Sequence, residues 1–381
     1  MGKQNMHEML RRGRSIHSEL RLLFQPAATL VLAFCLLLSS AAAAGQDDGI
    51  LLPRGYGKYS IFQQGIFRIK FMREGEDAVP LEDTNNSGCP DYVENVAKQL
   101  MVAYHLFCIV GGFPSPLDSP RYKGTKYIDV TIRGNAAMRG LNGVAYDATS
   151  LRPDPKNVDA TLADRDLPRV PVLVIGLNNK VDPKRNPTPA HEFFHQIQNG
   201  MAYSKNPWFY EGMAAFSEDA FRLRQGASAL DNKTRQATAQ EFPPREKRQM
   251  GEPTADSARS TLKAIVHDPQ YRASVFKSSY SAAKSVWRPL GNLCPDAGFV
   301  LSERDPIFSY SYSDGTPVLQ NGNMAGFNLM RRTLEKLGKF ETIPFLRFNY
   351  QKWTEVNQRR PENNDAIVEA LVNAAAELCP Q

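Results

Sequence analysis

The sequence predicts an α+β fold, with strands and helices in its first half and mainly helices in its second half. Strand-like runs occupy residues 59–63 and 66–71, residues 127–132 alternate weakly between apolar and polar side chains, and residues 170–177 form an apolar run typical of a buried strand. Helical patterns cover residues 90–107, 189–199 and 210–224, and return at 323–337 and 365–378. Hydrophobic residues make up 42% of the 381 residues, which suffices for a buried core and excludes a globally disordered chain.

Residues 1–45 have the layout of a signal peptide. A basic stretch comes first, with Lys3, Arg11, Arg12, Arg14 and Arg21. An apolar run at 27–38 and small residues at 39–45 follow, so we expect cleavage near Ala44 or Gly45. The mature protein is then secreted or periplasmic and has no stable membrane association. An uncleaved N-terminal anchor is the alternative, because the basic stretch is long.

The basic character of the chain resides largely in this leader. The leader contains five basic and two acidic residues, so its removal lowers the formal net charge from +6 to about +3. Elsewhere the sequence has no interleaving of basic and aromatic residues and no nucleic-acid-binding motif. We therefore expect no nucleic-acid partner.

A loop rich in Asp and Asn at 83–94 precedes the first predicted helix. Oxygen-bearing side chains stand at positions 1, 3, 5, 9 and 12 of the twelve-residue calcium-loop pattern, and a glycine stands at position 6. The candidate calcium ligands are Asp83, Asn85, Ser87, Asp91 and Glu94. The alternative is an Asp/Asn turn that caps the following helix, with Asp91 and Glu94 favourable near the helix N-terminus.

Four cysteines remain after the leader, and an even number in an exported protein predicts up to two disulfides. A helix from Pro90 to about Phe107 would separate Cys89 from Cys108 by about 27 Å, which is beyond the reach of a disulfide. We therefore expect each of these two cysteines to pair with Cys294 or Cys379. Four small buried thiols are the alternative.

The most specific motif is the pentapeptide HEFFH at 191–195. Thr188 is the expected N-cap of its helix. Histidines four residues apart lie on one face of a helix, so the imidazoles of His191 and His195 can reach a single zinc ion. Glu192 lies at the edge of that face, in position to act as a general base. Solvated surface pairing of these side chains is the alternative.

A third zinc ligand is expected from Glu211, which follows His195 after 15 intervening residues and opens the next helical run. Two histidines and a glutamate are the ligands of a catalytic zinc site with its fourth position open to water. Glu218, seven residues after Glu211, lies on nearly the same helix face and is a candidate to orient a ligand histidine. A solvated carboxylate is the alternative for Glu218.

Polar and charged residues dominate 225–260, which predicts a surface insertion or a lid. The chain then divides into a signal peptide at 1–45, an N-terminal catalytic lobe at 46–224, the insertion, and a C-terminal helical lobe at 261–381. A peptide or protein substrate is expected in the cleft between the two lobes.

The segments AHEFFHQIQ at 190–198 and PWFYEGMAAFSED at 207–219 resemble the gluzincin branch of zinc metallopeptidases, which includes thermolysin and the aminopeptidase-N-like enzymes. The chain is similar to a family of secreted bacterial zinc metalloproteases. This likeness extends through 65–132, where strand, Asp/Asn-rich loop, helix and strand follow in the same order, and covers roughly residues 60–220. The connection between the second histidine and the glutamate is shorter than in the aminopeptidases.

The resemblance implies a gluzincin-like fold, with a mixed sheet and the active-site helix in the N-terminal lobe and an α-rich C-terminal lobe. It implies zinc bound by His191, His195 and Glu211, with Glu192 as the base. Gluzincins commonly stabilise the oxyanion with a Tyr or His from the C-terminal lobe, and Tyr280 is the leading candidate. The other candidates for this role are Tyr310, Tyr312 and His267.

An endopeptidase is the expected activity, because the segment GNAAM at 134–138 lacks the acidic residue that follows Met in the aminopeptidase motif. Three alternatives remain open: an aminopeptidase, a hydrolase of non-peptide amides, and a catalytically silent secreted metal-binding or interaction protein on the same fold. The intact Glu192 speaks against the silent protein, because a structural zinc site needs no base. The expected cofactors are Zn²⁺ and, for the loop at 83–94, Ca²⁺.

Overall fold

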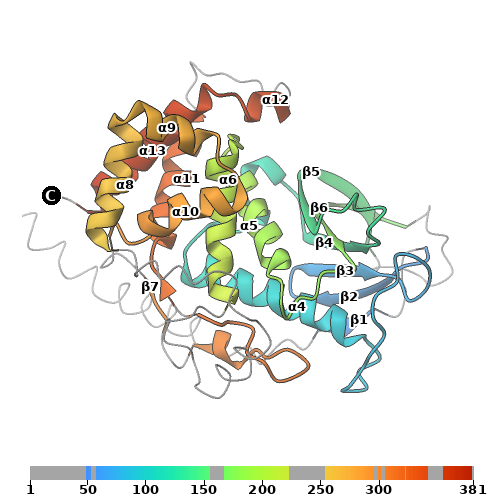
Figure 1. Cartoon of the computed structure of the whole chain (residues 1–381). Coiled ribbons are helices and arrows are strands. Elements are labelled where there is room, and N and C mark those ends of the chain that lie inside the picture. The colour runs from blue at the N-terminus through green and yellow to red at the C-terminus, as the bar shows by residue number, and fades with distance from the viewer. Residues whose placement is uncertain are drawn as a thin grey trace, which may run out of the picture. The chain divides into compact units, whose positions relative to one another are not determined.

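A six-stranded mixed sheet with the order β1-β2-β3-β4-β6-β5 organises the first half of the chain (Figure 1). The computed structural model describes residues 49–52, 57–154, 167–222, 254–294, 299–301, 305–321, 323–341 and 355–379. The strands are β1 (Ile50–Leu51), β2 (Ser60–Gln64), β3 (Phe67–Phe71), β4 (Tyr127–Arg133), β5 (Gly143–Pro153) and β6 (Arg169–Asn178). β3, β4 and β6 run parallel, whereas the β1–β2, β2–β3 and β5–β6 pairs are antiparallel.

The predicted signal peptide lies outside the described residues, as does most of the predicted insertion at 225–260. The last residues of the predicted insertion, 255–260, form the start of helix α8 (Ala255–His267). Thr254 caps this helix by accepting a hydrogen bond from the Ser257 N–H at 3.2 Å. Among the described residues, no helix has both the length and the hydrophobicity needed to cross a lipid bilayer.

Helices α4 (Asp91–Tyr104) and α5 (Thr188–Met201) cover one face of the sheet (Figure 1). Successive side chains of a strand point to opposite faces, so Phe67 and Ile69 of β3 face the helices. The Phe67 ring meets the Phe193 ring of α5 edge to face, with the centroids 5.3 Å apart. The opposite face of β3 carries Arg68, whose Nη2 lies 2.7 Å from Asp129 Oδ1 of β4. The face of the sheet that packs against α5 is therefore apolar here, and the charged side chains pair with one another on the opposite face.

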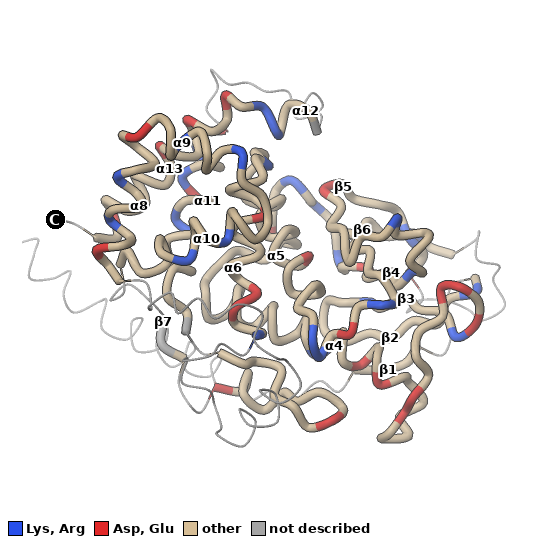
Figure 2. The backbone as a smooth tube through the Cα atoms, viewed as in Figure 1, with Lys and Arg blue, Asp and Glu red and all other residues tan. Residues whose placement is uncertain are grey.

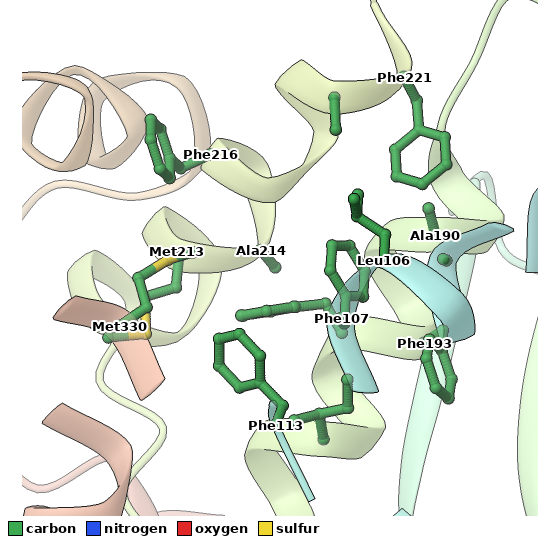
Figure 3. Packing of buried hydrophobic residues seen from close by; sticks show 14 of the residues in the cluster. Leu106, Phe107, Phe113, Ala190, Phe193, Met213, Ala214, Phe216, Phe221 and Met330 are labelled. Atoms are coloured by element: carbon green, nitrogen blue, oxygen red, sulfur yellow. The ribbon is translucent and has the colours of Figure 1, made fainter. Parts of the chain in front are cut away.

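An aromatic cluster joins the two halves of the chain. Helix α4 continues into a π-helical segment, η2 (His105–Val110), and the Phe107 ring of this segment lies 5.2 Å from the Phe194 ring of α5. The same Phe107 ring stacks at 5.6 Å on Phe327, at the start of α11 (Phe327–Glu341). Figure 3 shows Phe107 and Phe113 within this cluster, with Met213 and Met330 meeting at one side. The core is therefore continuous from α4 and α5 to the C-terminal helices.

The second half is helical, as predicted, with a small two-stranded sheet. Its helices are α6 (Pro207–Ser217), α8, α9 (Pro269–Phe276), α10 (Tyr280–Leu290), α11, α12 (Glu355–Gln358) and α13 (Asn363–Leu378), with β7 (Phe299–Val300) and β8 (Asn323–Met324) as the strands. The helix predicted from residue 323 begins later, at Phe327, because residues 323–324 pair with β7. Helix α11 has both basic and acidic residues, whereas the charged residues of α13 are all acidic (Figure 2), and Lys336 Nζ of α11 lies 2.7 Å from Glu377 Oε2 of α13.

Helix α10 approaches α6 closely because Gly212 carries no side chain. A Cβ atom at Gly212 would lie 2.6 Å from Cδ1 of Trp287, which is closer than packed atoms allow. The Trp287 indole N–H donates a hydrogen bond to the Trp208 carbonyl at 3.0 Å, and the two indole rings stack at 6.2 Å. This contact fixes α10, and with it Tyr280, next to α6.

The cysteine pairing predicted from the sequence is wrong. Cys294, after α10, and Cys379, after α13, form a disulfide with a Cα–Cα distance of 5.7 Å, while Cys89 and Cys108 are free thiols. The argument from helix length correctly kept Cys89 and Cys108 apart. That argument did not require Cys89 or Cys108 to pair with a cysteine of the C-terminal half. There, packing of the helices brings Cys294 and Cys379 together.

Glu341, at the end of α11, is buried against the segment that joins α5 to α6. Its carboxylate accepts hydrogen bonds from the Tyr203 N–H at 2.6 Å and from the Ser204 N–H and hydroxyl at 2.9 and 2.7 Å. Burial outweighs these bonds and raises the pKa of Glu341 from 4.5 to about 7.

We expect Glu341 to make the protein less stable as the pH rises through this range. The folded state binds the Glu341 proton more tightly than the unfolded chain does, so the free energy of unfolding falls between pH 4.5 and about 7. This difference in pKa corresponds to a loss of about 3 kcal/mol in the free energy of unfolding. Urea unfolding at several pH values should show a shallower decline in Glu341→Gln than in the wild type. Equal slopes in the two proteins would contradict this assignment.

Candidate metal centre

Helix α5 presents the two histidines of the HEFFH motif. The helix begins at Thr188, one residue earlier than the cap prediction requires, and Pro187 occupies the N-cap position. Asn186 supplies the capping contact instead, because its Oδ1 accepts hydrogen bonds from the Thr188 N–H at 3.1 Å and hydroxyl at 2.8 Å. His191 and His195 are both buried, and their rings lie 4.6 Å apart.

Glu211 of α6 meets both histidines. Its Oε2 lies 3.4 Å from Nε2 of His191 and 3.5 Å from Nε2 of His195. The three potential ligand atoms all lie within 4.8 Å of one another, and among the described residues this is the one such group of three His, Cys, Asp or Glu side chains. In tetrahedral zinc sites with bonds of about 2.0–2.1 Å, neighbouring ligand atoms are about 3.3 Å apart. The two separations that involve Glu211 are close to this value, and the three side chains offer donor atoms that can hold a metal ion.

The electrostatics of the site favour a cation. Burial lowers the pKa of His191, but hydrogen bonds to Glu211 and Glu218 outweigh it and raise that pKa to about 10. Burial raises the pKa of Glu211, but hydrogen bonds to the two histidines hold it well below its usual range. The partly buried carboxylate of Glu211 and the buried carboxylate of Glu218 thus need positive charge nearby, which a divalent ion can supply in place of a proton on His191.

Glu192 lies against strand β5, at the edge of the sheet. The Ala145 N–H of β5 donates a hydrogen bond to its carboxylate, and burial raises the pKa of Glu192. Only glycine fits at position 143 beside it: a Cβ there would lie 2.5 Å from Oε1 and 2.6 Å from Cγ of Glu192. β5 therefore sets the position of the candidate base, a contact that no motif in the sequence reveals.

Substitution of Gly143 by Ala should displace Glu192 without disturbing the ligands. The added methyl group would overlap both Glu192 and Thr188, so the Glu192 carboxylate has to leave its present position. A shift of about 1 Å at a catalytic group can reduce turnover by about 100-fold. We expect Gly143→Ala to lose activity on this scale and to bind zinc as the wild type does. Wild-type kcat in this variant would show that Glu192 does not depend on β5.

Glu218, the predicted histidine-orienting carboxylate, lies beside His191. In the short helix η7 (Glu218–Phe221), its Oε1 lies 2.8 Å from Nδ1 of His191, and its Oε2 lies 2.7 Å from Nη2 of Arg222. Burial raises the pKa of Glu218, but the contact with His191 outweighs it and lowers that pKa. A carboxylate at Nδ1 leaves Nε2 of His191 free to face Glu211.

Tyr280 begins α10 and lies beside the same histidine. Its ring centroid is 5.5 Å from that of His191, and its hydroxyl donates a 2.6 Å hydrogen bond to Glu218 Oε1. The hydroxyl thus lies on the Nδ1 side of His191 rather than on the side of Glu211. Its backbone φ of 41° is in the left-handed region, which is strained for a non-glycine residue.

The alternative oxyanion donors lie on other elements. The Tyr312 hydroxyl accepts a 2.9 Å hydrogen bond from Gln99 of α4. Tyr310 follows the short helix η9 (Pro306–Ser309), and His267 ends α8. Tyr280 is therefore the candidate whose ring contacts a ligand histidine.

The loop at 83–94 divides its predicted calcium ligands between two arrangements. The Ser87 hydroxyl donates a 2.6 Å hydrogen bond to Glu94 Oε1, and Nδ2 of Asn85 donates a 3.0 Å hydrogen bond to Glu94 Oε2, so positions 3, 5 and 12 of the pattern lie together. Asp83 instead accepts the Ser87 and Gly88 N–H groups, at 3.1 and 2.9 Å. Asp91, the first residue of α4, accepts hydrogen bonds from the Thr84 N–H at 3.1 Å and hydroxyl at 2.8 Å, but no side chain of the loop caps a helix N–H.

Comparisons with known proteins give no further guide to this site. No protein-family model, curated protein or solved structure matches the chain. The interpretation of the site therefore rests on the geometry of its residues.

Proposed function

We propose that the protein is a secreted zinc-dependent peptidase of the gluzincin type. The observation that carries this proposal is the placement of Glu211 Oε2 at 3.4 and 3.5 Å from the Nε2 atoms of His191 and His195. These distances match the edges of a zinc tetrahedron, and two histidines with one glutamate are the ligands of catalytic rather than structural zinc sites. Glu192, one residue from a ligand and supported by β5, supplies a base that a structural site would not need.

The chemistry of the site follows from these groups. Zinc held by His191, His195 and Glu211 would act as a Lewis acid that polarises the scissile carbonyl and makes water more acidic. Glu192 as a carboxylate accepts the proton from the attacking water and delivers it to the leaving amine. Its raised pKa suits both steps, because the group must take the proton and then release it. Tyr280 is the proposed oxyanion donor, and its hydroxyl has to leave Glu218 to act in this way.

The strand beside Glu192 supports a peptide as the substrate. β5 is the last strand in the sheet order and pairs with β6 on one side. An edge strand can bind an extended peptide by main-chain hydrogen bonds, with alternate side chains contacting the strand surface. Leu141, Tyr146 and Leu151 are large exposed apolar side chains in or near this strand. An extended chain bound there would pass close to Glu192, which favours cleavage within a polypeptide.

The disulfide supports the proposed location. A bond between Cys294 and Cys379 is typical of proteins that mature outside the reducing cytosol. It agrees with the secreted or periplasmic location that the leader at 1–45 predicts.

Metal analysis combined with peptide digestion tests the proposal. The purified mature protein should contain one zinc per chain and cleave casein and a peptide library, and a chelator should abolish cleavage until zinc is restored. Internal cleavage indicates an endopeptidase, whereas stepwise release of N-terminal residues indicates the aminopeptidase alternative. Zinc binding without cleavage of any peptide would favour the catalytically silent protein or a hydrolase of other amides.

A further inference from the structure

We infer that Gln198 is a positioning residue for His195: it fixes the imidazole tautomer that presents Nε2 to the metal. This inference rests on the proposed zinc site. Gln198 Oε1 lies 2.8 Å from Nδ1 of His195, one turn earlier on α5. The partner of this histidine is thus a neutral amide, whereas His191 has the carboxylate of Glu218 at its Nδ1.

The orientation of the Gln198 amide is determined by a second contact. Its Nε2 donates a 3.1 Å hydrogen bond to the carbonyl of Tyr210, and a carbonyl oxygen can only accept. The amide oxygen must therefore face His195. An oxygen at this position requires a proton on Nδ1, which leaves the lone pair of Nε2 directed at Glu211 and the proposed metal.

Tyr210 holds the same imidazole from its face. Its ring stacks on the His195 ring with the centroids 4.0 Å apart and the planes at 6°. Its hydroxyl donates a 3.1 Å hydrogen bond to Asn199 Oδ1 and its backbone carbonyl accepts the bond from Gln198, so Tyr210 is held to α5 by both its side chain and its backbone. Gln198 and Tyr210 are buried, at 1% and 5% exposure. Rotation of the His195 ring would therefore break a buried hydrogen bond and a stacked contact.

The two ligand histidines are consequently held by unlike partners. A carboxylate at Nδ1 makes an imidazole more basic and adds negative charge near the metal, whereas an amide orients the ring without adding charge. Gln198 therefore orients the His195 ring without adding negative charge. Glu211 and Glu218 remain the carboxylates nearest the two histidines. Removing the amide should therefore weaken zinc binding through loss of orientation.

The test compares zinc affinities of Gln198→Leu and Gln198→Glu with that of the wild type. Both variants lose the hydrogen bond to Tyr210, but only Glu keeps an oxygen that can accept from Nδ1 of His195. We expect the zinc dissociation constant, measured by chelator competition, to rise about 10- to 100-fold in Gln198→Leu. We expect Gln198→Glu to recover most of that loss. An equal loss in both variants would assign Gln198 a merely structural role and overturn the inference.

Gln196→Leu is the matched control. Gln196 is also buried on α5, and its Nε2 donates to the carbonyls of Tyr146 and Val174 at 3.1 and 3.0 Å, on the side of the sheet. Its loss should lower thermal stability and leave the zinc affinity within about three-fold of wild type, because its side-chain amide donates to the sheet and not to either histidine. A loss of affinity in Gln196→Leu as large as in Gln198→Leu would also overturn the inference.

Nitrogen NMR of the zinc-loaded wild type tests the inference without relying on the folding of any variant. His195 should show a protonated Nδ1 and a metal-bound Nε2, and the reverse assignment would overturn the inference. The same measurements distinguish a failure of this inference from a failure of the proposed function. If the wild-type protein has no affinity for zinc, both proposals are wrong. Tight wild-type binding that is unchanged in Gln198→Leu removes this one alone.

Discussion

Glu192→Gln is expected to retain one zinc per chain and to lose peptide hydrolysis. Glutamine has the shape of glutamate and can occupy the space between α5 and β5, where Glu192 is 6% exposed, but it cannot take a proton from water. General base catalysis typically contributes about 10²- to 10⁴-fold, so kcat should fall by that factor. Steady-state kinetics with a cleavable peptide and metal analysis of the same preparation measure both quantities.

Glu218→Gln is the matched control for this substitution. Glu218 is equally buried and lies 2.8 Å from His191, yet it faces Nδ1 rather than the proposed substrate side. This variant should bind zinc about 10- to 100-fold more weakly. At saturating zinc it should retain far more turnover than Glu192→Gln. Substantial hydrolysis by Glu192→Gln would show that another group serves as the base.

Loss of a ligand is expected to remove the metal itself. Glu211→Ala and His191→Ala each delete one of three protein ligands, so zinc content should fall well below one ion per chain. Zinc that binds only the folded state stabilises it by about 4 kcal/mol when its free concentration is 1,000 times the dissociation constant. Thermal unfolding with and without zinc should show this stabilisation in the wild type and its absence in both variants.

His105→Ala controls for removal of a histidine elsewhere. Nε2 of His105 lies 3.1 Å from Asp305 Oδ1, and this pair belongs to η2 and the segment before η9 rather than to α5 and α6. Its loss should leave the stabilisation by zinc unchanged. Full zinc content in Glu211→Ala would show that the carboxylate is not a ligand.

Much of this site could be predicted from the sequence because its parts are local. Helical periodicity places His191 and His195 on one face of α5, and Glu211 enters the site from the next helix along the chain. The central strands β3, β4 and β6 were also predictable, because β6 is a nearly continuous apolar run and β3 and β4 alternate between apolar and polar side chains. The mixed α/β architecture with a mixed six-stranded sheet agrees with the predicted α+β class, while the gluzincin fold itself remains part of the proposal.

The contacts that the sequence did not reveal depend on chain packing over long distances. Strand β5 was missed because, as a half-exposed edge strand, it has neither a continuous apolar run nor strict alternation. Its contact with Glu192 through Gly143 was hidden for the same reason. The pairing of Cys294 with Cys379 spans 85 residues and follows from how α10 and α13 pack, which cysteine spacing does not encode.

Anomalous diffraction at the zinc absorption edge, on crystals grown with zinc, tests most directly whether these side chains form one metal site. The expected result is a single strong peak in the site, about 2.0–2.2 Å from Nε2 of His191, Nε2 of His195 and a carboxylate oxygen of Glu211. No peak among these three side chains, or a zinc ion held elsewhere while Glu211 points away from both histidines, would contradict the proposed function.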